Sequence, residues 1–105
     1  MKSTLSQRVF IEIAVLCGFM TTYRKLLEKV IGGRSDANIR FDDLRNLLAR
    51  LGFEERSRGS HHVFVRAGVE EMINLQRDGS VAKPYQVRQV RAVVTKYGLD
   101  EEGDN

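Results

Sequence analysis

The two histidines of the chain are adjacent, in the segment RGSHHVF at residues 58–64. Histidine is the side chain best suited to accept and to donate protons near neutral pH. His61 follows the turn Gly59-Ser60 and opens a predicted strand beside Arg58. There it can deprotonate a ribose 2′-hydroxyl that attacks the adjacent phosphate, while the arginine stabilises the charge on the phosphoryl oxygens. The alternative is that His61 is an ordinary surface residue of the turn.

Consecutive residues of a strand point to opposite faces of a sheet, so His61 and His62 form a poor chelating pair. No cysteine lies nearby, and we expect neither a metal site nor a cofactor. The strand offers two sets of side chains, either of which could face the core. One holds His61, Val63 and Val65, and the other holds His62, Phe64 and Arg66. The catalytic hypothesis requires His61 to reach solvent, and His62 is then a structural neighbour.

Four basic side chains could contact the phosphates of a nucleic acid, which gives affinity without reading the base sequence. They are Arg58, Lys83, Arg88 and Arg91. The alternative for Arg88 and Arg91 is the solvated face of an amphipathic helix, and we expect both to point to solvent. Tyr85 could stack on a base.

Charge is distributed unevenly along the 105 residues. Four of the 14 acidic side chains and none of the 17 basic ones follow Leu99, so residues 1–99 carry a net charge of +7. A basic body favours a polyanionic partner, most simply nucleic acid. The alternative is a surface of solvated lysine and arginine side chains.

Length and composition, with 42% hydrophobic and 30% charged residues, are typical of one globular domain. The lone cysteine, Cys17, excludes an internal disulfide and a cysteine-based zinc site. The apolar run at residues 9–20 is too short to span a bilayer and contains Glu12. We therefore expect a cytoplasmic protein without membrane association, and the sequence leaves its oligomeric state open.

Residues 1–38 are predicted to form an N-terminal extension that ends in a turn-rich segment at residues 32–38. Residues 7–19 could be a buried helix or a strand. A helix follows, with Thr21 and Thr22 as candidates for its N-cap and Gly32 as its stop. Met20 could be the true start of translation.

Residues 39–99 show a clearer pattern. Apolar residues at helical spacing predict a helix from Phe41 to Leu51, with acidic residues in its first turn and Gly52 as its stop. Three strands with hairpin spacing are predicted at residues 53–56, 61–66 and 72–75, with turns at residues 57–60 and 67–68. Pro84 suits the first position of a final helix, which Gly98 ends. The fold class is α+β, with two helices on one face of the sheet and the other face open. The acidic tail, residues 100–105, is expected to be disordered.

The segment FDDLRNLLARLGFEERSRGSHHVF, followed by the Lys-Pro-initiated helix that ends in KYGL, resembles the HicA family. These are small messenger-RNA interferases, the toxin half of HicA–HicB toxin–antitoxin pairs. The resemblance covers about residues 39–99. It implies a fold similar to double-stranded-RNA-binding domains, in the order α-β-β-β-α, here with an N-terminal helical extension.

The resemblance also implies a metal-independent ribonuclease whose catalytic histidine falls on His61, with Gly59 and Ser60 shaping the turn. It implies messenger RNA as substrate and inhibition by a HicB-like antitoxin that covers the active site. Two features depart from the family pattern. Residues 74–76 lack the further histidine that many members carry after the third strand, and residues 84–86 replace a Gly-Thr pair. A non-catalytic RNA-binding module of the same fold is the alternative.

Overall fold

Three antiparallel strands form the sheet, in the order β1-β2-β3. They are β1 (Glu54–Arg58), β2 (His61–Val65) and β3 (Ile73–Gln76). The computed structural model describes residues 19–102, which adopt the predicted α+β class. Predictions on residues 1–18 and 103–105 lie outside the described residues.

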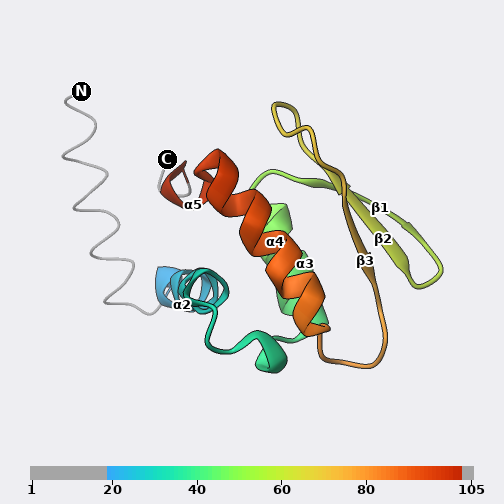
Figure 1. The fold of residues 1–105 in the computed structure, drawn as a ribbon, viewed down its shortest axis with the longest axis horizontal. Coiled ribbons are helices and arrows are strands. Elements are labelled where there is room, and N and C mark those ends of the chain that lie inside the picture. The colour runs from blue at the N-terminus through green and yellow to red at the C-terminus, as the bar shows by residue number, and fades with distance from the viewer. Residues whose placement is uncertain (1–18, 103–105) are drawn as a thin grey trace.

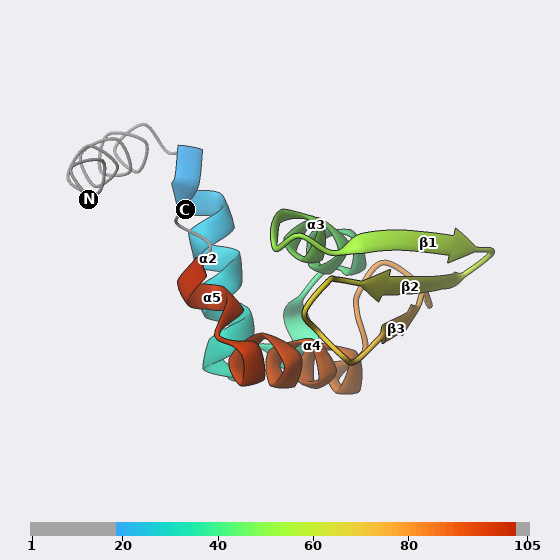
Figure 2. The ribbon, with the colours of Figure 1, turned by 90° about the horizontal axis from the view of Figure 1, so that it is seen from above.

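The two helices α3 (Phe41–Arg50) and α4 (Pro84–Tyr97) lie on the same side of the sheet (Figures 1 and 2). The helix α2 (Phe19–Gly32) packs against both of them, at the end of the molecule away from the sheet. A short 3-10 helix, η1 (Asp36–Asn38), connects α2 to α3 and also contacts α4. Within residues 19–102, every helix is too short or too polar to span a lipid bilayer.

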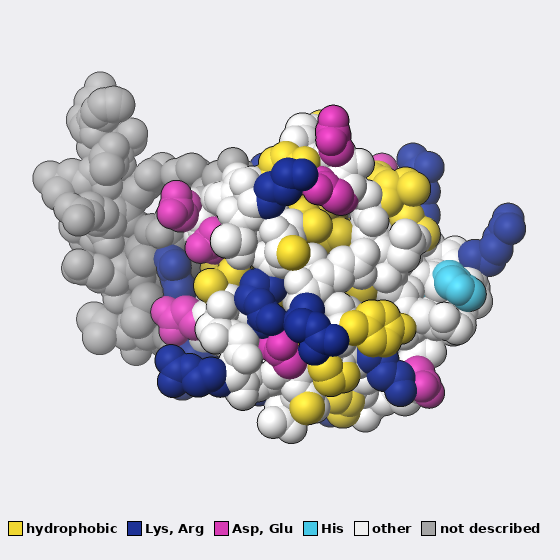
Figure 3. Space-filling view, in the orientation of Figure 1, with side chains coloured by type: hydrophobic (Ala, Val, Ile, Leu, Met, Phe, Trp, Pro, Cys, Tyr) yellow, Lys and Arg dark blue, Asp and Glu magenta, His cyan; other side chains and the backbone are white. Residues whose placement is uncertain are grey.

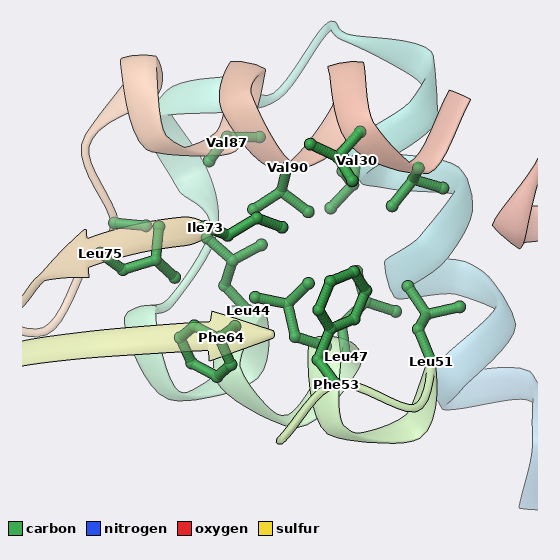
Figure 4. Close-up of a cluster of buried hydrophobic side chains, with 14 of the residues drawn as sticks. Val30, Leu44, Leu47, Leu51, Phe53, Phe64, Ile73, Leu75, Val87 and Val90 are labelled. Atoms are coloured by element: carbon green, nitrogen blue, oxygen red, sulfur yellow. The ribbon is translucent and has the colours of Figure 1, made fainter. Parts of the chain in front are cut away.

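The core lies between the sheet and the helices, where buried side chains of β2 and β3 meet those of the helices (Figure 4). The sheet contributes Phe64, Ile73 and Leu75, and α3 and α4 contribute Leu44, Leu47, Val87 and Val90. α2 adds Leu27 and Val30, which are both buried. The helical part of the predicted N-terminal extension, α2, therefore supplies part of the core.

The start of α2 differs from the prediction. α2 already includes Phe19, the first described residue, so Thr21 and Thr22 lie inside the helix and do not cap it. A threonine caps a helix only where the chain enters the helix, and here the chain is already helical two residues earlier. The predicted stop at Gly32 is confirmed.

The C-terminal tail also differs from the prediction in part. A short helix, α5 (Leu99–Glu102), follows Gly98, which adopts the left-handed conformation that ends α4 (φ 63°). Leu99 is buried in the core and fixes the start of this helix. Disorder was expected from residue 100, and burial of the preceding leucine explains why order continues past it.

A second backbone pairing aligns the starts of α3 and α4. Arg40 forms an antiparallel bridge with Val81. Phe41 N–H donates to the Ser80 carbonyl at 2.9 Å, and Ala82 N–H donates to the Ile39 carbonyl at 2.8 Å. These bonds bring the loop between β3 and α4 beside the first turn of α3.

Candidate functional site

The β1–β2 hairpin has a turn of only two residues, Gly59 and Ser60. Gly59 has φ 60°, a left-handed conformation that side chains bearing a Cβ atom rarely adopt, so glycine suits this turn. The predicted turn at residues 57–60 is therefore too long, because Ser57 and Arg58 still belong to β1. A two-residue turn keeps the strands paired up to its edge, which places Arg58 directly opposite His61.

The pairing register separates the two faces of the sheet. Ser57 pairs with His62 and His62 with Leu75, and these residues lie on the side that the helices cover. Arg58 pairs with His61 and His61 with Gln76, and all three side chains are exposed on the uncovered side. His61 therefore reaches solvent, as the catalytic hypothesis required.

The surroundings of His61 are polar and basic. The next residues on the uncovered face are Arg56 on β1 and Asn74 on β3, which flank Val63. Figure 3 shows the exposed histidine at the tip of the sheet, next to a basic side chain. Within residues 19–102, no side-chain hydrogen bond or ion pair holds the His61 ring.

His62 has the opposite environment, since its side chain is only 8% exposed. Its Nδ1 lies 2.6 Å from Oε2 of Glu55 and 2.9 Å from Oγ of Ser57. The Phe41 ring meets the imidazole edge-on, with the ring centroids 5.2 Å apart. We assign the proton of the ring to Nδ1, which then donates to the carboxylate.

Glu55 is the centre of this polar cluster. Arg45 of α3 binds both carboxylate oxygens, with Nε 2.9 Å from Oε2 and an η-nitrogen 3.1 Å from Oε1. The Ser57 hydroxyl also donates to Oε2, at 3.0 Å. Burial alone raises the pKa of Glu55, but hydrogen bonds from Arg45, His62 and Ser57 outweigh it and lower the pKa to about 2. The carboxylate is therefore ionised and links β1 to both α3 and β2.

The serine, histidine and glutamate of this cluster do not form a hydrolase triad. In a triad, the acid and the nucleophile contact different nitrogens of the imidazole. Here Ser57 and Glu55 both contact Nδ1, and the hydroxyl donates its hydrogen to the carboxylate. The arrangement is structural, because it satisfies polar groups beneath the helices.

The predicted phosphate-binding residues differ in their availability. Arg58 and Arg88 are exposed, and Lys83 forms a 2.9 Å ion pair with Asp78, which is also exposed. Arg91 does not point to solvent as predicted, since its guanidinium forms a two-pronged ion pair with Asp36 at 2.9 and 3.1 Å. It also donates to the Val30 carbonyl at 3.0 Å. A contact of any of the four with RNA stays a prediction.

Arg45, Glu55 and Ser57 are not among the residues predicted from the sequence. The signal for Ser57 was the turn length, because a two-residue turn keeps residue 57 in β1, directly opposite residue 62. The longer predicted turn removed Ser57 from the strand and hid this alignment. Arg45 gave no comparable signal, since its contact with Glu55 depends on how α3 crosses the sheet.

Within residues 19–102, no group of three or more histidine, cysteine, aspartate and glutamate side chains is arranged to hold a metal ion. No protein-family model, curated protein or solved structure matches the chain.

Proposed function

We propose that the protein is a metal-independent endoribonuclease that cleaves messenger RNA, with His61 as general acid/base, as a HicA-like toxin would. One observation carries the proposal: His61 is exposed at the mouth of a two-residue hairpin, on the uncovered sheet face, with Arg58 and Gln76 as its pairing partners. The order α3-β1-β2-β3-α4 supports a fold similar to double-stranded-RNA-binding domains.

The bond-making and bond-breaking steps need only His61 and water. His61 removes the proton of a ribose 2′-hydroxyl, and the 2′-oxygen forms a bond to the adjacent phosphorus. The bond from phosphorus to the 5′-oxygen breaks, and that oxygen takes a proton from water. The products are a 2′,3′-cyclic phosphate and a 5′-hydroxyl. Arg58 stabilises the charge that builds on the phosphoryl oxygens, and Lys83 and Arg88 add phosphate contacts.

The same face is suited to an inhibitor. A HicB-like antitoxin that covers the uncovered face of the sheet would block access to His61, and both proteins would act in the cytoplasm. Coexpression with the protein encoded by the adjacent reading frame tests this partner. We expect a stable complex that protects RNA from cleavage.

The test of catalysis is cleavage of a labelled single-stranded RNA by the purified protein in EDTA. We expect His61→Ala to lower the cleavage rate at least about a hundredfold, because a general acid/base contributes about that much or more. The free energy of unfolding should change by less than about 0.5 kcal/mol, since the side chain is exposed. A 2′-deoxy substitution at the cleaved position should block the reaction. Asn74→Ala, an exposed residue of the same face, is the matched control. Full activity of His61→Ala would refute the assignment.

The second candidate is an RNA-binding module without catalysis. One observation favours it: within residues 19–102, no hydrogen-bond partner fixes the tautomer of the His61 ring, as a catalytic histidine requires. Binding of the labelled RNA without cleavage, both in EDTA and after addition of Mg²⁺, would support this candidate over the first.

A further inference from the structure

A recess of about 280 Å³ lies where the end of β3 meets the start of α4. Its lining is formed by Gln76, Arg77, Asp78, Lys83 and Tyr85. Its volume is close to the lower end of small-ligand pockets, roughly 300 Å³. Its lining residues are not members of the polar cluster around Glu55, to which Arg77 connects through Asp42 and Arg45. The roles assigned to His61 and Arg58 do not use the recess.

The wall of the recess is held in place by buried and paired groups. Gln86, which is 1% exposed, donates from Nε2 to the Gln76 carbonyl at 2.9 Å. Its Oε1 accepts from the Lys83 backbone N–H at 3.1 Å. One side chain thus ties the end of β3 to the start of α4, so that both sides of the recess keep a fixed separation.

Arg77 is held in place by residues of α3. Its guanidinium pairs with the Asp42 carboxylate and lies 4.6 Å from the centroid of the Phe41 ring. The hydrogen bonds from Arg77 and Arg45 lower the pKa of Asp42, which keeps this carboxylate ionised. Arg77 therefore lines the recess, and Asp42 already balances its positive charge.

The recess adjoins the proposed catalytic residue. Gln76, which lines it, is the pairing partner of His61. The Arg77 N–H donates to the Ser60 carbonyl at 2.8 Å, which connects the recess to the β1–β2 turn. Figure 3 shows the exposed histidine and the apolar and basic side chains around the start of α4 on the same face of the molecule.

Two side chains of the recess have the chemistry to hold a nucleotide. The Tyr85 ring is 57% exposed although it is large and aromatic, and aromatic rings at such positions stack on unpaired bases. The Lys83 ammonium can bind a phosphate. Its present partner, Asp78, is 70% exposed, and an exposed ion pair of this kind contributes little energy, so a phosphate can replace the carboxylate.

We propose that this recess binds one unpaired nucleotide of a single-stranded RNA, with the base stacked on Tyr85 and a phosphate on Lys83. This inference rests on the proposed function, because it makes the recess the subsite that brings the neighbouring phosphodiester to His61. A base in a duplex cannot reach Tyr85 without leaving its stack. Single-stranded RNA is therefore the substrate class.

The test uses a single-stranded 2′-O-methyl RNA that contains one 2-aminopurine, whose fluorescence is quenched by stacking. This RNA lacks the attacking hydroxyl and stays intact whether or not the protein is a nuclease. We expect the protein to quench the fluorescence, and Tyr85→Ala to lose the quenching and bind about tenfold more weakly. Tyr85→Phe should behave like the unchanged protein, and Lys83→Ala should weaken binding but keep the quenching.

Met72→Ala is the matched control, because Met72 is 58% exposed and lies at the other end of β3, roughly 13 Å from Gln76. It should leave binding and quenching unchanged. If Tyr85→Ala quenched the fluorescence as much as the unchanged protein, the recess would not be the nucleotide-binding site. The proposed nuclease activity, measured separately as RNA cleavage, would be unaffected by this result. Quenching that depends on Tyr85 without any cleavage would support the recess and contradict the nuclease. Absence of RNA binding would overturn both.

Discussion

Proton transfer by a histidine requires access to the substrate and a ring held in one orientation. In this protein the two requirements fall on different residues. His61 is exposed and has no side-chain hydrogen bond within residues 19–102, whereas His62 is held at 2.6 Å by Glu55 but lies beneath the helices. In the proposed reaction, substrate bound on the uncovered face would itself have to orient His61, so the proposed nucleotide subsite would matter for catalysis.

The pKa of Glu55 predicts a specific loss of stability in acid. Its pKa is about 2 in the folded protein, against an ordinary value of 4.5, so the unfolded chain binds the proton more readily between these values. The stabilisation is fully present above about pH 4.5 and is lost as the pH falls through 2. We expect it to reach roughly 1–3 kcal/mol, discounted because the side chain is 24% exposed.

Urea unfolding of the unchanged protein and of Glu55→Gln at pH 7 and at pH 3 measures this contribution. The glutamine should lower the free energy of unfolding at pH 7 and reduce its dependence on pH. Glu71→Gln is the control, since hydrogen bonds from Lys96 and Tyr97 lower the pKa of Glu71 to about 2 in an exposed setting that solvent screens. If both variants lose the same amount, the cluster around Glu55 adds nothing beyond a surface ion pair.

At the scale of elements, an ion pair connects η1 to α4. Asp36 and Arg91 are 16% and 24% exposed in their side chains, and the hydrogen bond from Arg91 lowers the pKa of Asp36. A double-mutant cycle with Asp36→Asn and Arg91→Gln should give a coupling energy of about 1 kcal/mol or more, above the usual value for exposed pairs. Lys83 and Asp78 form the matched exposed pair, for which we expect less than about 0.5 kcal/mol. Equal coupling in both cycles would contradict the structural role of Arg91.

The elements that the sequence predicted well are those whose signal is local. Pro84 opens α4 and Gly98 ends it as expected, because backbone conformation at these residues depends on the residue itself. α2 ends at Gly32, just before Gly33, which has φ 75°. The three strands appear in the predicted order, with ends shifted by one or two residues. The paired end of β1 was missed because the length of a hairpin turn depends on how both strands pair.

The predictions that failed depend on packing between distant segments. Arg91 lies off the apolar stripe of α4, where sequence alone indicates solvent, yet Asp36 lies 55 residues earlier and meets it in space. Similarly, the helical pattern of α2 could not reveal that Leu27 and Val30 complete the core. The exposure of His61 was left open by the sequence, because both faces of β2 carry apolar residues.

Across the whole molecule, the basic charge should make RNA affinity depend on salt in a way that identifies the true phosphate contacts. Each cation that neutralises a phosphate of single-stranded RNA adds about 0.7 to the slope of log affinity against log salt concentration. Arg58 is exposed at the mouth of the hairpin, so Arg58→Ala should lower the slope by about that amount, as measured with the 2′-O-methyl RNA between roughly 50 and 200 mM salt. Arg91→Ala also removes one positive charge, but Asp36 already neutralises that charge in the folded protein. The slope should therefore stay unchanged, while the free energy of unfolding falls. A lower slope for Arg91→Ala would show that RNA displaces Asp36 and would restore Arg91 as a phosphate contact.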